Sequence, residues 1–462
     1  MLGVVALSFS SCKKWLQVDP EDRFTEQQIF SAPTGFEDAI NGIYLQMNNS
    51  NMYGQKLTMS TVEMLANRFY TSSSSSNTLT RLSKWEYGES TVKSHITPIW
   101  MRTYVAIGNI NHLLYALDKY KGNISEQRWN TIRGEALGLR AFLHFDLLRL
   151  FGPAYNISTA EEPTIPYYTS LSPNIGDFLS SNQIIDKLLV DINESITRLE
   201  ADNSTENGSG GNRNLKFNEV AALALKARIL QWKGDNPGAY DVATLGISKA
   251  ENFSWVAQTK VSDVENPDRI FLSEVLFGLY NSALYDTYNK VYYYELDSDN
   301  LLGSGSTTYL ESIFEGNTTD YRYTYSWKVP PMGQTNPTFF KYADIVQKNR
   351  PDLNPQRFVI PLMRKSELYY IAAECADDDD EALGYLNQVR NRRGISSLAT
   401  ATNLSNEIMK EYRKEFFGEG QLWYYYKRHQ ITQIISPAAS TLVTVPNVAW
   451  QVPVPDDEFS AR

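Results

Sequence analysis

Residues 132–153 read IRGEALGLRAFLHFDLLRLFGP, the clearest helical pattern in the chain. Apolar residues recur in it at spacings of three and four, the period of an α-helix with one apolar face. These residues are Ala136, Leu139, Leu143, Leu147 and Leu150. Gly152 and Pro153 follow, and they end a helix because glycine readily leaves the helical conformation and proline cannot extend it. The stretch therefore predicts a long helix that ends at Phe151.

The same periodicity predicts further helices on both sides. They cover Thr34–Met47, Trp100–Leu117, Ile184–Leu199, Asn218–Trp232, Pro237–Ala250, Lys365–Cys375, Glu381–Arg393 and Ser405–Arg428. The helices that start at Asn218 and Pro237 are joined by a short turn, and so are those that start at Lys365 and Glu381. Short-looped helix pairs with small residues at their contacts resemble tetratricopeptide-like units. We therefore expect a mainly α fold in which tetratricopeptide-like helix pairs form a scaffold, mainly over residues 34–251 and 360–430.

A long segment between the two helical parts, residues 252–347, lacks a sustained helical pattern and is rich in tyrosine. A span of this size without regular structure usually carries function. We expect it to form a long irregular, loop-rich half that packs on the helical scaffold.

The composition argues against several classes of protein. The net charge is −10, and an acidic chain repels phosphate backbones, so no nucleic-acid partner is expected. The chain has no stretch of 18 apolar residues, so no transmembrane helix is expected. Its two cysteines, Cys12 and Cys375, cannot build a disulfide framework. Cys375 lies in an apolar helical run, which predicts a buried, inert thiol.

The N-terminus has the order of a lipoprotein signal peptide. Leu2–Phe9 is apolar, Ser10 and Ser11 are small, and Cys12 is followed by two lysines. Small residues before Cys12 allow a signal peptidase to approach, and the thiol accepts a diacylglycerol. We therefore expect residues 1–11 to be removed and lipid on Cys12 to hold the protein at a membrane.

The residues that could carry catalysis have simpler structural explanations. The four histidines show no metal-ligand spacing, and no CxxC pair is present. Glu411 and Glu415 lie one helical turn apart, as a glycosidase pair could, but Arg413 and Lys414 beside them predict ion pairs. Asp377–Asp380 could hold Ca²⁺, yet contiguous acids seldom converge on one ion, so a solvated turn is expected. We predict that the protein is not an enzyme and has no catalytic residue, cofactor or metal site.

Aromatic residues form the candidate binding site. Residues 321–327 (YRYTYSW) alternate rings with polar residues, and a strand would place the rings on one side. These rings are Tyr321, Tyr323, Tyr325 and Trp327. A second group consists of Asn67, Arg68, Tyr70, Trp85 and Tyr87. A sugar ring has an apolar face and a rim of hydroxyls, which suits flat aromatic rings flanked by hydrogen-bonding side chains. We expect at least two of these rings to contact a ligand.

A set of motifs follows in order along nearly the whole chain. They are Cys12–Pro20 (CKKWLQVDP), Phe36–Tyr44 (FEDAINGIY), Trp100–Asn109, Arg133–Leu143, Ala382–Gly394 (ALGYLNQVRNRRG) and Glu411–Gly420 (EYRKEFFGEG), followed by Trp423, Lys427 and Arg428. Together they resemble the SusD/RagB family, the outer-membrane nutrient-binding lipoproteins of Bacteroidetes-type bacteria. Leu422 and Tyr425 stand where that family usually has Arg and Asp. Loss of both partners leaves no unpaired charge, so the expected fold is unchanged.

This resemblance implies one domain over residues 12–462, with residues 252–347 on the ligand side. It implies noncovalent capture of a nutrient at the outer-membrane surface and its delivery to a SusC-like TonB-dependent transporter. The aromatic residues favour a glycan or oligosaccharide as the ligand. Two alternatives stay open: a peptide or protein fragment bound on the same fold, as the RagB branch implies, and a helical-repeat scaffold that binds only a protein partner.

Overall fold

The computed structural model describes residues 25–460 except 73, 75, 172–174, 201–212 and 400–402. The long helices are α2 (Pro33–Met47), α5 (Ser90–Lys119), α6 (Glu126–Phe151), α7 (Ser181–Glu200), α8 (Glu219–Lys233), α9 (Asn236–Lys249), α15 (Lys365–Cys375), α16 (Asp379–Arg392) and α17 (Leu404–Glu415). The shorter helices are α1 (Glu26–Ile29), α3 (Thr61–Leu65), α4 (Thr78–Ser83), α10 (Gln258–Val261), α11 (Leu284–Val291), α12 (Thr307–Phe314), α13 (Tyr321–Thr324), α14 (Asn354–Phe358), α18 (Leu422–His429) and α19 (Asp456–Ser460). The mainly α fold is therefore confirmed, although α5 begins at Ser90 and not at the predicted Trp100.

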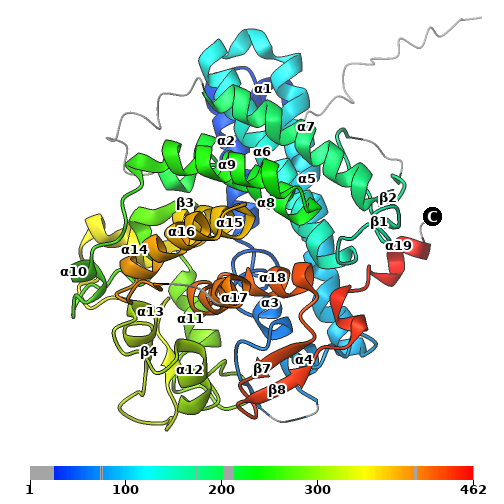
Figure 1. Ribbon diagram of the computed structural model, residues 1–462. Helices are drawn as coiled ribbons and strands as arrows, with labels where there is room; N and C mark the ends of the chain where they lie inside the picture. The colour runs from blue at the N-terminus through cyan, green and yellow to red at the C-terminus, as the bar shows by residue number, and fades with distance from the viewer. Residues whose placement is uncertain are drawn as a thin grey trace, which may run out of the picture.

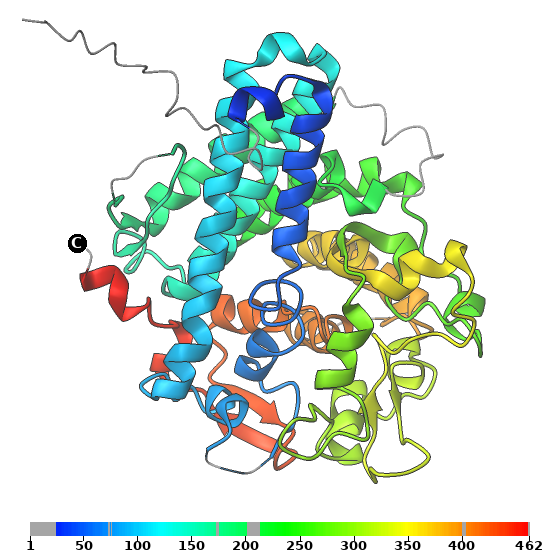
Figure 2. The same ribbon diagram turned by 180° about the vertical axis from the view of Figure 1, so that it is seen from behind.

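Successive helices pack against one another to form a layered scaffold. α6 packs on α7, α7 on α8, α8 on α9, α9 on α15 and α15 on α16, while α2 and α5 pack together beside α6. Figure 1 shows this stack across the upper and middle part of the molecule, and Figure 2 shows α2 and α5 side by side from behind. The two predicted pairs, α8 with α9 and α15 with α16, are both present, which confirms the tetratricopeptide-like organisation.

Close contact between α6 and its neighbours depends on a small residue. A Cβ on Gly138 would lie 2.1 Å from the ring of Phe217 and 2.8 Å from the hydroxyl of Ser195, so glycine is required there. Two residues further along α6, Arg140 donates two hydrogen bonds of 2.7 Å to Asp191 of α7. Glycine thus allows the close packing, and a buried bidentate ion pair fixes the register between the two helices.

The predicted helix Ser405–Arg428 is wrong as a single element, because it is divided into α17 and α18. The chain turns between them, where Gly418 and Gly420 adopt φ angles of 74° and 69°. Glycine reaches this left-handed region at little cost, so the turn is favoured locally. It brings Tyr425 of α18 against Tyr412 of α17, with ring centroids 4.4 Å apart.

Residues 252–347 form much of the lower half of Figure 1. This half is more regular than predicted, since it contains α10 to α13 and the strand β3 (Val275–Tyr280). β3 pairs in antiparallel fashion with β6 (Val359–Arg364), and α15 of the scaffold follows β6 directly. The other described strand pairs are β1 (Pro163–Ile165) with β2 (Leu179–Ser180), β4 (Trp327–Lys328) with β5 (Thr338–Phe339), and β7 (Gln433–Ser436) with β8 (Thr441–Thr444). One cluster of buried apolar side chains runs through both halves.

Among the residues that the structure describes, no helix combines the length and apolar character needed to cross a membrane. Cys375 is buried at the end of α15, as predicted. Burial raises the pKa of its thiol to about 12, so the thiol stays protonated and unreactive at neutral pH.

Candidate functional site

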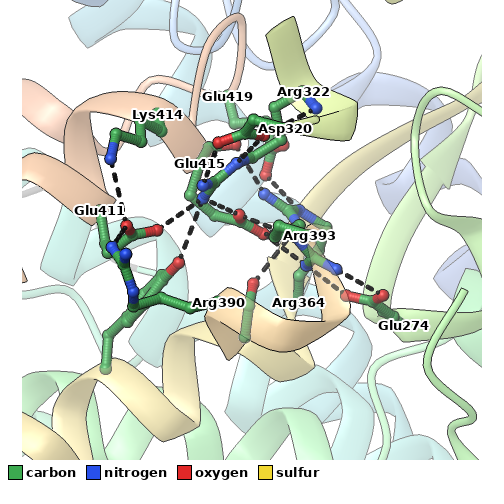
Figure 3. A network of polar contacts seen from close by, with 12 residues as sticks. Glu274, Asp320, Arg322, Arg364, Arg390, Arg393, Glu411, Lys414, Glu415 and Glu419 are labelled. Atoms are coloured by element: carbon green, nitrogen blue, oxygen red, sulfur yellow. Dashed lines mark hydrogen bonds and ion pairs between the residues drawn. The ribbon is translucent and has the colours of Figure 1, made fainter. Parts of the chain in front are cut away.

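A buried network of charged side chains fastens the lower half to the scaffold (Figure 3). Its centre is Glu415 of α17, which binds Arg322 of α13 at 2.9 Å and Arg393, just after α16, at 2.6 Å. Glu415 also binds Arg364 of β6, and Arg393 extends to Glu274 at 2.6 Å. None of these five residues exposes more than 4% of its surface. Four segments that are distant in sequence are therefore joined through one carboxylate.

The two acids considered for catalysis are held in their ionised form. Burial raises the pKa of Glu415, but Arg393 and Arg364 outweigh this effect and hold the pKa well below its usual range. Glu411 binds Arg322 at 2.9 Å, and its pKa is also lowered. A carboxylate in this state cannot serve as the proton donor of a glycosidase. The prediction of ion pairs at Glu411 and Glu415 is confirmed, although most of the partners come from other elements.

The predicted strand at residues 321–327 is wrong for most of its length. Its first part is the helix α13, and Trp327 enters the short strand β4. Tyr323 stacks on a phenylalanine of α12 with ring centroids 5.0 Å apart. Tyr321 and Tyr325 instead pack against a separate small apolar cluster. Because a helical turn directs successive side chains differently from a strand, these rings do not form one platform.

Trp327 lies in the core and is only 5% exposed. Its ring contacts Phe339, Phe417 and Phe69 at centroid distances of 4.9, 5.1 and 5.9 Å. A ring enclosed in this way presents no open face on which a sugar could stack. The structure therefore places Trp327 in the core, in contact with the ring of Phe69, and not at a surface.

Three predicted site residues meet at one cavity of about 640 Å³. Asn67, Tyr70 and Trp85 lie in its wall, which residues 64–85 form together with the β7–β8 hairpin. Hydroxyl groups and small apolar side chains make up most of the rest. Among the described residues that line it, Lys84 alone carries a charge. Its volume falls within the range of small-molecule binding sites.

Backbone geometry fixes the ends of this wall. Asn67 and Trp85 adopt φ angles of 51° and 56°, a left-handed conformation that is uncommon for a bulky residue such as tryptophan. The Asn67 amide donates to the Ser83 carbonyl at 2.9 Å, and the Trp85 indole donates to the Leu65 carbonyl at 3.0 Å. These bonds hold Asn67 next to Ser83 and Trp85 next to Leu65, so the two ends of this segment lie side by side.

A segment of residues 252–347 connects the two walls without lining the cavity itself. The backbone of Tyr70 exchanges two hydrogen bonds of 2.9 Å with Gly303. Three residues later, Ser306 hydrogen-bonds to Ser440 between β7 and β8 at 2.8 Å. Residues 303–306 thus hold residues 64–85 and the hairpin next to each other.

Arg68 and Tyr87 lie outside the lining of the cavity. The Arg68 guanidinium is buried 3.3 Å from the centroid of the Phe417 ring. The Tyr87 hydroxyl donates to the Ala449 carbonyl at 2.9 Å, and its ring is also buried. Both side chains are therefore buried and do not line the cavity.

Sequence reasoning missed the β7–β8 hairpin, which forms one wall of the cavity. Two runs rich in β-branched residues, Gln433–Ser436 and Thr441–Thr444, flank Pro437-Ala-Ala-Ser440. Such a pattern of β-branched runs around a turn segment is typical of a hairpin. That signal was therefore present, but it does not indicate what the hairpin packs against.

A buried acid next to the cavity should make stability depend on pH. Glu63 lies 3.7 Å from Arg68, and burial raises its pKa to about 7 despite this pairing. Because the folded pKa exceeds the unfolded one, the folded state binds the proton more tightly, and stability falls as pH rises towards 7. Between about pH 5 and pH 7 the parent protein should lose stability on the order of 1 kcal/mol per pH unit. The Glu63→Gln variant cannot ionise at this position and should not show this loss.

Urea unfolding of both proteins at about pH 5 and about pH 8 measures this difference. The exposed Glu311→Gln variant is the control and should follow the parent protein. Equal stability changes in the parent and Glu63→Gln would contradict the prediction.

Within the described ranges, no group of three or more histidine, cysteine or acidic residues could hold a metal ion. In the acidic stretch 377–380, Asp378 caps α16 by accepting from the N–H of Glu381 at 2.9 Å. Cys12, the predicted lipidation site, lies outside the described residues.

The fold and this cavity define a helical-repeat binding protein, and comparison with known proteins supplies its family. A family model described as "Starch-binding associating with outer membrane" matches residues 14–230, and the model of the SusD family matches residues 279–445. The chain belongs to the SusD family. The resemblance inferred from its motifs is confirmed, and the family is one of binding proteins and not of enzymes.

Individual relatives agree with this assignment over most of the chain. A SusD-like protein of Formosa agariphila is 22% identical over 92% of this chain and 89% of its own length. A crystal structure of a SusD superfamily protein from Bacteroides thetaiotaomicron is similar with a TM-score of 0.74, at 22% identity over 93% of this chain and 98% of the other. A structure named laminarin binding SusD-like protein has a TM-score of 0.64, at 18% identity over 93% and 97%.

Proposed function

We propose that the cavity between residues 64–85 and the β7–β8 hairpin binds an oligosaccharide. The observation that carries this proposal is the lining: the half-buried ring of Tyr70 lies beside several hydroxyls and one charged residue, Lys84, while Trp85, which is 7% exposed, offers only a small part of its ring. Such a surface suits neutral sugar rings, which offer C–H faces to aromatic groups and hydroxyls to polar ones. A peptide would bring charged groups that this lining does not match. The name of the laminarin-binding relative adds support for a glycan ligand.

A glycan array probed with residues 13–462 is the direct test, followed by calorimetric titration of any positive sugar. Binding that depends on salt and on carboxylate groups would favour the peptide alternative. Binding to neither sugars nor peptides would leave the helical-repeat scaffold as the explanation.

Filling the cavity should abolish this binding. Ala438 is exposed in the hairpin and lines the cavity, so Ala438→Trp can place a large ring inside it without disturbing the core. We expect affinity to fall by more than about tenfold, or about 1.4 kcal/mol. The matched control is Leu442→Trp, because Leu442 is 59% exposed in the same hairpin and is not among the lining residues. Equal affinities of both variants in calorimetric titration would assign the ligand to another surface.

We further propose that the protein is anchored at the outer-membrane surface by lipid on Cys12. The apolar run that ends in Ser10-Ser11-Cys12 supports this, as does the family's association with the outer membrane. Cys12→Ser should remove all label in cells fed a clickable fatty acid and leave an unprocessed precursor. Equal labelling of parent and variant would rule out this anchor.

The bound sugar is then delivered to a SusC-like TonB-dependent transporter. Noncovalent binding supports this transfer, because the ligand leaves unchanged. Purification from detergent extracts through a tag on this protein tests for a stable complex with such a transporter. Recovery of the protein without any transporter would argue against a stable complex.

A further inference from the structure

We propose that a small monovalent anion, such as chloride, binds in a buried cavity where α6, α8 and α18 meet. The cavity has a volume of about 20 Å³, so it holds one water-sized occupant. Its wall also includes Glu367 of α15 and Tyr412 of α17. It is separate from the proposed sugar cavity, with which it shares no lining residue.

Three hydrogen-bond donors in this wall lack a partner among the described residues. They are Nε of Arg149, Nη1 of Arg228 and Nε1 of Trp232. The three residues are only 3%, 4% and 4% exposed, so bulk water does not reach these atoms freely. Guanidinium and indole N–H groups can donate but cannot accept. The occupant of the cavity must therefore be an acceptor, because unsatisfied buried donors are costly.

The other atoms of the two guanidinium groups are already engaged. Arg149 donates to Gln421 at 3.3 Å and also binds Asp146. Arg228 donates to both carboxylate oxygens of Glu367, at 2.7 and 2.5 Å. Arg149 and Arg228 are thus held in place by neighbours while one donor of each remains available.

An anion matches this wall better than a water molecule does. A water molecule accepts at most two hydrogen bonds, whereas an anion can accept from all three unpartnered donors, those of Arg149, Arg228 and Trp232. The wall carries three guanidinium groups, since Arg428 of α18 joins the other two. Asp146 and Glu374, which pair with Arg149 and Arg428, are not lining residues. Because each guanidinium group is paired with a carboxylate, the three unpartnered donors, and not a net positive charge, favour the anion, and the size of the cavity admits a halide ion but not sulfate or phosphate.

Bromide replaces chloride and can be located by anomalous scattering. We expect a bromide peak between Arg149, Arg228 and Trp232 in crystals of the protein grown with sodium bromide. In solution, chloride should raise the melting temperature by about 2–4 °C over gluconate at matched ionic strength. Gluconate is too large for the cavity and serves as the non-binding anion.

Trp232→Phe tests the donors without emptying the core. It removes one N–H but keeps a ring against Phe145, so the fold should persist and the chloride-dependent rise should shrink by at least half. The matched control is Trp423→Phe, because Trp423 also has an unpartnered buried indole N–H but does not line this cavity. Its chloride response should equal that of the parent protein.

Two outcomes would overturn the proposal. One is a cavity peak without anomalous signal, together with equal melting temperatures in chloride and gluconate, which identifies the occupant as water. The other is a chloride response that is unchanged in Trp232→Phe, which places any anion elsewhere.

Discussion

Glu415→Gln is expected to lower the free energy of unfolding by about 3–5 kcal/mol, because it breaks a buried ion network at its centre. The carboxylate binds Arg322, Arg364 and Arg393, and all of these residues are at most 4% exposed. Glutamine has nearly the same shape and still accepts a hydrogen bond, so the loss reports charge and not packing. Three buried guanidinium groups would then share fewer counter-charges.

Chemical denaturation of the parent protein and the variant measures this loss. The control is Glu407→Gln on the same helix, where Glu407 pairs with Lys410 at 2.8 Å near the surface. That partly exposed pair should contribute less than about 1 kcal/mol. Similar small effects for both variants would show that the buried network does not hold the two halves together.

Trp327→Ala is expected to cost about 3–5 kcal/mol of stability while sugar affinity stays close to that of the parent protein. The indole is 5% exposed and packs against three phenylalanine rings, so its removal leaves a cavity in the core. The rival expectation from the sequence is that Trp327 stacks on the ligand. In that case affinity would be lost on the order of 1–3 kcal/mol with the fold intact.

A thermal melt and a calorimetric titration of the same variant separate the two roles. Val329→Ala is the control, because Val329 lies two residues away and is 58% exposed. It should leave both quantities unchanged. A normal melting temperature beside lost binding of Trp327→Ala would restore Trp327 to the ligand site.

Helical periodicity was enough to predict most of the scaffold from the sequence. The run from Ile132 ends at Phe151 as expected, and α15 has the predicted bounds Lys365–Cys375. This succeeded because the spacing of apolar residues and the Gly152-Pro153 stop are local properties of the chain. Where a local signal was overlooked, as at Gly418 and Gly420, one predicted helix became two.

The candidate site was predictable only in part. Asn67, Tyr70 and Trp85 line the cavity, whereas the alternating rings of residues 321–327 do not. Alternation predicts a strand only if a partner strand is available, and here the first part of that stretch forms a helix next to the buried ion network.

The sequence by itself determined the helical scaffold, the family and the non-catalytic character of the paired acids. Tertiary structure decided which rings are buried and which segments meet, since residues 64–85 and the β7–β8 hairpin are more than three hundred positions apart. The tertiary structure also determined that the ion-pair partners of Glu415 come from α13, β6 and the end of α16. The physical reason is that a helix depends on spacings of three and four residues, whereas a cavity or an ion network depends on distances between side chains that no local pattern encodes.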